Sequence, residues 1–232
     1  MEEKKFVGFK KEELGVKEYI KNALGKGKIS AVSIEYTPVG EKIVVATSKP
    51  GLVIGRKGEK IDELTTFLKK NFNLDNPHIE IKDIQDPRLD AQLVADEIAV
   101  SLERKGSLKF KVIAYKTLRN IMNAGALGAE LVLSGKLPSD RSRTWRFTEG
   151  YLKKTGDPSK VVDRAMSQAV TLMGVVGIKV SILPPDAVIH DQINVDDEMR
   201  ARVRLNAVEE KPKKTTKKTT KKSSKKSKED KE

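Results

Sequence analysis

The sequence contains no cysteine, and only two histidines and one tryptophan occur among its 232 residues. Without cysteine there can be no disulfide bonds and no thiolate metal sites, and nothing indicates an oxidising compartment. His78 and His190 are far apart and have no partner at metal-ligand spacing, so we expect no metal site and no cofactor. A nucleotide-binding P-loop is also missing, because Lys60 follows Gly58 at the wrong spacing. The sequence therefore supplies no reaction centre and indicates neither an enzyme nor a small-molecule substrate.

Long apolar runs are absent as well. The first residues, MEEKKFVGFKKEELG, are charged where a secretory signal would need an apolar stretch. No segment approaches the roughly 20 apolar residues that span a membrane as a helix. We therefore expect no membrane partner and a cytoplasmic location.

Positive charge exceeds negative charge by a wide margin. There are 46 lysines and arginines against 33 acidic residues, a net charge of +13, which points to nucleic acid first and an anionic membrane second. From Lys211 onward the chain has 11 lysines and three acidic residues, a net +8, which leaves +5 for residues 1–210. The segment KPKKTTKKTTKKSSKKSK contains nothing apolar to bury. Residues 186–232 are therefore predicted to form an extended arm and a disordered lysine-rich tail.

The first 85 residues alternate between helical and strand patterns. Apolar residues recur at helical spacing over residues 9–27, and residues 28–48 alternate apolar and polar side chains on both sides of a Pro-Val-Gly turn. A glycine loop and a second helical register follow, and the alternating pattern returns in residues 77–84. The predicted order is helix, strand, strand, short helix, glycine loop, helix and strand.

Residues 86–185 form a second predicted unit, in which helices come first and strands follow. A turn at Asp86 and Pro87 precedes a helical register in residues 88–106, and Asp86 is the candidate N-cap. A further helix is predicted for residues 108–123, and four strand-like segments interrupted by glycine and proline come after it. Two helices against about four strands predict an α+β two-layer domain.

Three Gly-x-x-Gly pairs occur in the chain, and only the first has a basic centre. In GLVIGRKGEKIDEL, residues 51–64, Arg56 and Lys57 stand between Gly55 and Gly58. Glycine permits positive φ and close approach of another backbone, and the following helix offers free N–H groups with a partial positive charge. We expect a bare main chain that binds a sugar-phosphate strand; the alternative is a tight turn with solvated charges. The candidate residues are Ile54, Gly55, Arg56, Lys57, Gly58 and Lys60.

Two unlike parts of the chain carry a resemblance to one family. VIGRKGEKIDEL, placed after two strands, resembles the loop of a type II KH domain, a domain whose GxxG loop clamps about four nucleotides. The later segments LDAQLVADEIAVSLER, NAGALGAELVLSGKL, RTWRFTEGYL and GVVGIKVSILPP resemble the carboxy-terminal domain of the universal small-subunit ribosomal protein numbered three. The segment LSGKLPSDRSRTWRF and the lysine-rich tail are similar to the archaeal branch first and the eukaryotic branch second.

The resemblance implies both a fold and a place. It implies a type II KH domain at residues 1–85, with a three-stranded sheet and helices on one face, and a ribosomal α+β domain at residues 86–185. It also implies a position in the head of the small ribosomal subunit, lining the channel through which messenger RNA enters. The implied partners are small-subunit ribosomal RNA, messenger RNA and neighbouring head proteins.

In this family, basic residues on a helix of the second domain face the incoming message and are tied to its unwinding. Other members carry an adjacent basic pair early in this helix, whereas here Lys111 is followed by Val112. Helical spacing places Lys111 near the apolar sector, so that its ammonium would have to snorkel outward. The candidate RNA-binding residues of the helix are Lys109, Lys111, Lys116 and Arg119.

Three arginines flank the single tryptophan. Arg141, Arg143 and Arg146 are candidates for phosphate contact, and Trp145 is a candidate for stacking. The alternative is a buried Trp145 with arginines at its rim. We expect the lysine-rich tail to anchor in ribosomal RNA, because each lysine near a phosphate releases counterions.

The sequence thus favours a structural RNA-binding component of the ribosome, and two other classes stay open. One is an abasic-site lyase, in which a lysine of lowered pKa attacks the sugar; eukaryotic relatives of the family are linked to DNA repair. The other is a free KH-type regulator of selected transcripts, against which the second domain weighs.

Overall fold

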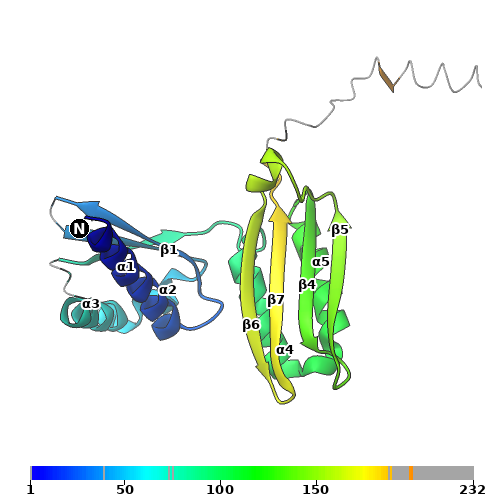
Figure 1. Ribbon diagram of the computed structural model, residues 1–232, viewed down its shortest axis with the longest axis horizontal. Coiled ribbons are helices and arrows are strands. Elements are labelled where there is room, and N and C mark those ends of the chain that lie inside the picture. The colour runs from blue at the N-terminus through cyan, green and yellow to red at the C-terminus, as the bar shows by residue number, and fades with distance from the viewer. Residues whose placement is uncertain are drawn as a thin grey trace, which may run out of the picture. The chain divides into compact units, whose positions relative to one another are not determined.

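The computed structural model describes residues 2–38, 40–72, 74, 76–187, 189 and 199–200. Residues 1–190 group into one compact unit that holds two separate β-sheets with their helices (Figure 1). Most of the predicted arm and the whole lysine-rich tail lie outside the described residues. The boundary expected between residues 85 and 86 stays a prediction.

The first sheet has three strands in the order β1-β2-β3. Strand β2 pairs antiparallel with β1 and parallel with β3. The predicted order of elements and the predicted three-stranded KH-like sheet with its helices are confirmed. The bounds are α1 Glu2–Leu24, β1 Ile29–Thr37, β2 Gly40–Thr47, α2 Pro50–Ile54, the 3₁₀ turn η1 Arg56–Gly58, α3 Glu59–Asn71 and β3 His78–Asp83.

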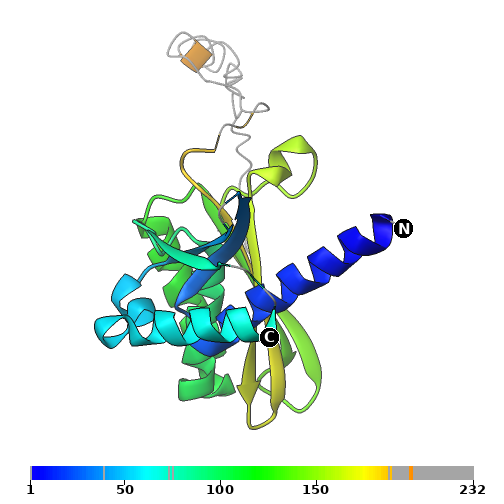
Figure 2. The same ribbon diagram turned by 90° about the vertical axis from the view of Figure 1, so that its left-hand side faces the viewer.

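Helical spacing explains how α1 packs. Val16, Ile20 and Leu24 are four residues apart, so they share one face, and all three are buried in the core of the first sheet. Helix α1 also contacts α3 through two stacked rings, because the centroids of Tyr19 and Phe67 are 3.9 Å apart. The first turns of α1 extend away from this packing (Figure 2), and Phe6 there is 70% exposed.

The second sheet has four antiparallel strands in the order β5-β4-β7-β6. Helices α4 and α5 lie along one face of it (Figure 1), and a continuous apolar core fills the space between the two layers. This confirms the predicted α+β domain of four strands and two helices. The bounds are α4 Ala91–Lys105, the 3₁₀ turn η2 Ser107–Lys109, α5 Phe110–Asn123, β4 Gly128–Lys136, β5 Ser142–Gly150, the 3₁₀ turn η3 Asp157–Lys160, β6 Asp163–Thr171 and β7 Gly174–Leu183.

The start of α4 differs from the prediction. Asp86 is not the N-cap, because its carbonyl instead accepts the amide of Leu89 at 3.1 Å in a separate turn. The N-cap is Asp90, whose side chain accepts the amide of Leu93 at 3.0 Å. The carboxylate of Asp163 on β6 accepts a further free amide of this helix end, that of Ala91, at 2.8 Å.

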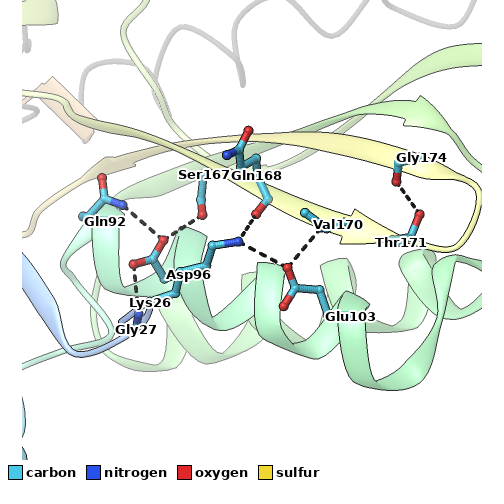
Figure 3. Close-up of polar contacts among 10 residues, drawn as sticks. All are labelled: Lys26, Gly27, Gln92, Asp96, Glu103, Ser167, Gln168, Val170, Thr171 and Gly174. Carbon is cyan, nitrogen blue, oxygen red and sulfur yellow. Dashed lines mark hydrogen bonds and ion pairs between the residues drawn. The ribbon is translucent and has the colours of Figure 1, made fainter. Parts of the chain in front are cut away.

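Two carboxylates of α4 connect the turn between α1 and β1 to the second sheet (Figure 3). Asp96 accepts the backbone amide of Gly27 at 3.0 Å. Glu103 accepts the amide of Val170 on β6 at 3.0 Å and the ammonium of Lys26 at 3.3 Å. We call Asp96 and Glu103, with the groups they bind, the α4 clasp.

Candidate nucleic-acid interface

The backbone of the glycine loop turns sharply between α2 and α3. Gly55 has φ +76°, Lys57 has φ +52° and Gly58 has φ +86°. A side chain with a Cβ adopts such left-handed angles only at a cost of about 1–2 kcal/mol. The two glycines therefore stand where the turn needs them, and Lys57 carries backbone strain at the tip.

Arg56 and Lys57 are both exposed, as expected of a site that receives a polyanion. Over the part of the chain that the structure describes, neither side chain has an ion-pair or hydrogen-bond partner. A hollow beside the loop brings them next to acidic groups of α3, including Glu59 and Glu63. The hollow therefore carries charges of both signs, because Lys70 at the end of α3 also lines it.

The two glycines differ in what lies above them. A Cβ added at Gly58 would meet nothing within 4 Å, whereas one at Gly55 would lie 2.9 Å from Cγ of Lys60. The amide of Gly55 donates to the carbonyl of Gly51 at 3.1 Å, and Nζ of Lys60 donates to the carbonyl of Leu52 at 3.4 Å. The expectation of a bare main chain is thus wrong at Gly55, where the flexible Lys60 side chain covers the backbone. At Gly58, where there is open space for a Cβ, it stays a prediction.

Apolar side chains border the loop. Val53 is buried in the first core, whereas Leu52 is 46% exposed and Ile54 is 38% exposed. The predicted site residue Ile54 therefore lies beside the loop with part of its side chain accessible.

Helix α5 places its four predicted cations on the surface. Lys109 just before the helix and Lys111, Lys116 and Arg119 on it are all exposed. The sequence of α5, FKVIAYKTLRNIMN, contains no acidic residue. None of the four has a carboxylate partner within the described ranges, so their charges are available to a ligand.

Lys111 takes a specific position. Its Nζ lies 4.8 Å from the ring centroid of Trp145 and 5.9 Å from that of Phe110, which is cation–π geometry. The ring of Phe110 packs 5.4 Å from Trp145, and the indole N–H donates to the carbonyl of Leu137 at 3.2 Å. Trp145 is therefore half-buried and engaged with its own protein, with Lys111 at its rim.

The three arginines near Trp145 differ in their surroundings. Arg141 and Arg143 are exposed, and no partner is found for them among the described residues. The guanidinium Nε of Arg146 lies 2.7 Å from the carboxylate of Glu130, a buried residue on the neighbouring strand β4. Lys154 contacts the same carboxylate at 2.9 Å. Arg146 thus neutralises a buried carboxylate within the protein.

Sequence interpretation missed an apolar surface beside the cations of α5. Leu108 is 75% exposed, Val112 is 69% exposed and Tyr115 is 61% exposed. A signal was present for Val112, because helical spacing places it opposite the buried Ala114 and Ile121; Tyr115 lies at the edge of the buried face, three residues before Leu118. We call Leu108, Val112 and Tyr115 the apolar stripe.

Other kinds of site receive no support from the described residues. These residues include no group of three histidine, aspartate or glutamate side chains placed to hold a metal ion. His190 lies outside them. No helix in the described part of the chain is long and apolar enough to cross a membrane.

The three-stranded sheet, its helices and the cationic glycine loop define the class of this protein as a KH-domain protein with a second α+β unit. Two family models match the chain in this order, the KH domain at residues 15–89 and the carboxy-terminal domain of ribosomal protein S3 at residues 98–182.

Archaeal proteins named small ribosomal subunit protein uS3 are similar over most of the chain. The Methanocaldococcus jannaschii protein is 40% identical over 87% of this chain and 97% of its own length. The Methanococcus aeolicus protein is 41% identical over 84% of this chain and 93% of its own length. The Haloarcula marismortui protein is 38% identical over 79% of this chain and 60% of its own length.

The chain belongs to the uS3 family of small ribosomal subunit proteins. This confirms the predicted family, its archaeal character and the prediction of a ribosomal structural component rather than an enzyme.

Proposed function

We propose that this protein binds small-subunit ribosomal RNA and borders the path of incoming messenger RNA, using two cationic surfaces. One is the glycine loop, with Arg56, Lys57 and the open backbone at Gly58. The other is the exposed side of α5, with Lys109, Lys111, Lys116 and Arg119, to which Arg141 and Arg143 add charge. The same proposal includes contacts with neighbouring proteins of the small-subunit head and a cytoplasmic location in the small subunit.

The observation that carries the proposal is the pair of unpartnered cations at the tip of a strained glycine turn. Several cations of the described residues, such as Lys17 with Glu13 at 2.5 Å, are held by carboxylates of the protein itself. Arg56 and Lys57 have no such partner among the described residues, and the main chain beside them at Gly58 is open. A phosphate of an RNA strand supplies the missing negative charge.

Not every predicted cation takes the same part in the proposal. Arg146 stabilises the fold through Glu130 and is assigned no direct RNA contact. Lys60 holds an intermediate position, because its ammonium reaches a phosphate only after it leaves the carbonyl of Leu52.

The test is charge reversal in the loop, with Arg56→Asp and Lys57→Asp in one variant. RNA binding should weaken at least tenfold at low salt, and the slope of log K against log salt should become shallower by about 1.4, since about 0.7 is lost per phosphate contact. Fluorescence anisotropy with a labelled single-stranded RNA over a salt series measures both quantities. The control is Lys4→Asp with Lys11→Asp, which changes the charge equally at two exposed positions of α1 that have no ion-pair partner among the described residues. An unchanged slope in the loop variant would refute the proposal.

The abasic-site lyase alternative requires a lysine of lowered pKa. A hydrogen bond from Lys10 to Glu13 raises the pKa of Lys10, and a hydrogen bond to Glu80 raises the pKa of Lys42. Both shifts favour the charged ammonium, which is not a nucleophile. These two lysines therefore lend the alternative no support.

A further inference from the structure

We propose that the apolar stripe of Leu108, Val112 and Tyr115 is a stacking site for unpaired bases, so that α5 binds single-stranded RNA in preference to duplex. The inference rests on the proposed function, since it assigns a strand state to the RNA that this surface takes. It adds to that function a contact that does not depend on charge.

Two residues of the stripe lie on α5 and one lies just before it. Val112 and Tyr115 are three residues apart and are therefore neighbours on the helix surface, whereas Leu108 belongs to the 3₁₀ turn η2 that leads into α5. Each is more than 60% exposed. Large apolar side chains that gather on a surface mark a binding site more often than single ones do.

Tyr115 is held in place although it is exposed. Its ring meets the buried Phe147 of β5 edge to face, with centroids 5.2 Å apart and an angle of 77° between the ring planes. Such a contact restricts the rotamers of the tyrosine before any ligand arrives. A base that stacks on a ring held in this way loses less entropy on binding.

Cations surround the stripe on the same helix. Lys111 lies four residues before Tyr115 and Arg119 lies four residues after it, while Lys116 lies four residues after Val112. Because α5 has no acidic residue, this charge is not balanced within the helix.

An exposed aromatic ring with apolar neighbours among cations matches single-stranded RNA, whose exposed bases alternate with phosphates. In a duplex the bases stack on each other inside the helix, and only phosphates and groove edges remain accessible. An apolar patch of a protein partner would cover the stripe but would leave the cations beside it without partners. The charge around the stripe therefore favours RNA as the occupant.

The experiment compares an unstructured 12-nucleotide RNA with a 12-base-pair RNA duplex, each labelled with fluorescein and titrated with the full chain. Tyr115→Ala should weaken binding of the single strand by about five- to a hundredfold, the range expected for loss of one stacked base. It should leave the salt slope and the affinity for duplex unchanged. Tyr115→Phe should bind like the original protein, because the ring is kept.

The control is Lys116→Ala, which should weaken both RNAs and make the salt slope shallower by about 0.7–0.9. Thermal unfolding by circular dichroism shows whether Tyr115→Ala still folds, and Val112→Ser provides a second variant that spares the Phe147 contact. Equal weakening of single strand and duplex by Tyr115→Ala, or no weakening at all, would overturn the proposal.

One outcome points to another occupant. If Tyr115→Ala leaves RNA binding intact but lowers the fraction of protein that assembles into small subunits, the stripe contacts a protein neighbour and the inference is wrong. Charge reversal at Arg56 and Lys57 tests the proposed function separately, because those residues lie on the other cationic surface.

Discussion

At the scale of single residues, the two glycines of the loop both have positive φ, but they differ in what surrounds them. Gly58 has φ +86° and open space above it, so its value lies in backbone freedom and in access for a ligand. Gly55 has φ +76° and is covered by Lys60, so its value lies in letting that side chain pack. Glycine is thus needed at Gly58 for the turn and for ligand access, and at Gly55 for the turn and for the packing of Lys60.

Gly58→Ala should lower the free energy of unfolding by about 1 kcal/mol, because alanine is strained at positive φ even where there is room for its methyl group. Urea unfolding followed by circular dichroism measures the change. Gly51→Ala is the matched control, since this helical glycine also has nothing within 4 Å of an added Cβ but has no positive φ. A loss of the same size in both variants would show that the turn angle is not the cause.

At the scale of elements, carboxylates of α4 bind backbone groups that helix and strand geometry leaves free. Asp90 accepts an amide of the first turn of its own helix. In the α4 clasp, Glu103 accepts the amide of Val170 on β6, the last strand in the sheet order β5-β4-β7-β6. An edge strand has unpaired amides, and a side chain that binds one of them makes the edge less available to other strands.

The amide of Val170 lowers the pKa of Glu103 below its ordinary value of 4.5, with a further contribution from Lys26. Because the folded-state pKa is the lower one, the charged form stabilises the fold above about pH 4.5, and this stabilisation is lost as the pH falls through the folded-state pKa. Glu103→Gln keeps an acceptor but removes the charge. We expect it to lower the free energy of unfolding by about 0.5–1 kcal/mol at pH 7 and by little at pH 3.

Urea unfolding of both proteins at pH 7, 5, 4 and 3 measures this convergence. The exposed Asp157, whose carboxylate lies 2.7 Å from the ammonium of Lys160, supplies the control variant Asp157→Asn. A difference for Glu103→Gln that stays constant down to pH 3 would contradict the assignment of the pKa shift to the folded state.

At the scale of the whole molecule, the charge is unevenly divided. Residues 1–210 carry +5 and the segment from Lys211 onward carries +8. Within the described residues, the glycine loop and α5 each present exposed cations that have no carboxylate partner. The lysine-rich segment adds charge in a sequence that has nothing apolar to bury.

Removal of residues 211–232 should weaken RNA binding and make its salt dependence shallower, because fewer counterions are released. The ratio of affinities for single strand and duplex should stay the same, because that ratio depends on the apolar stripe. Anisotropy titrations over a salt series measure both. A chain with residues 211–232 in shuffled order should bind like the original, since only its charge matters, and a loss in the shuffled chain would point to a specific contact instead.

The order of elements, the strand number of both sheets and the cationic loop could be predicted from the sequence, because each depends on spacing within a few residues. Apolar residues that recur every second position mark strands, and those that recur every three to four positions mark helices. Gly-Arg-Lys-Gly after an apolar run marks the loop.

The tertiary structure alone showed that Lys60 covers Gly55, that Arg146 is held by Glu130 and that Tyr115 rests on Phe147. The pairs Arg146–Glu130 and Tyr115–Phe147 join residues well separated along the chain, and the side chain of Lys60 folds back toward α2. Local periodicity carries no record of such contacts, since they arise only when strands pair and helices dock. The same physical reason explains why the cations could be named from the sequence, whereas their partners could not.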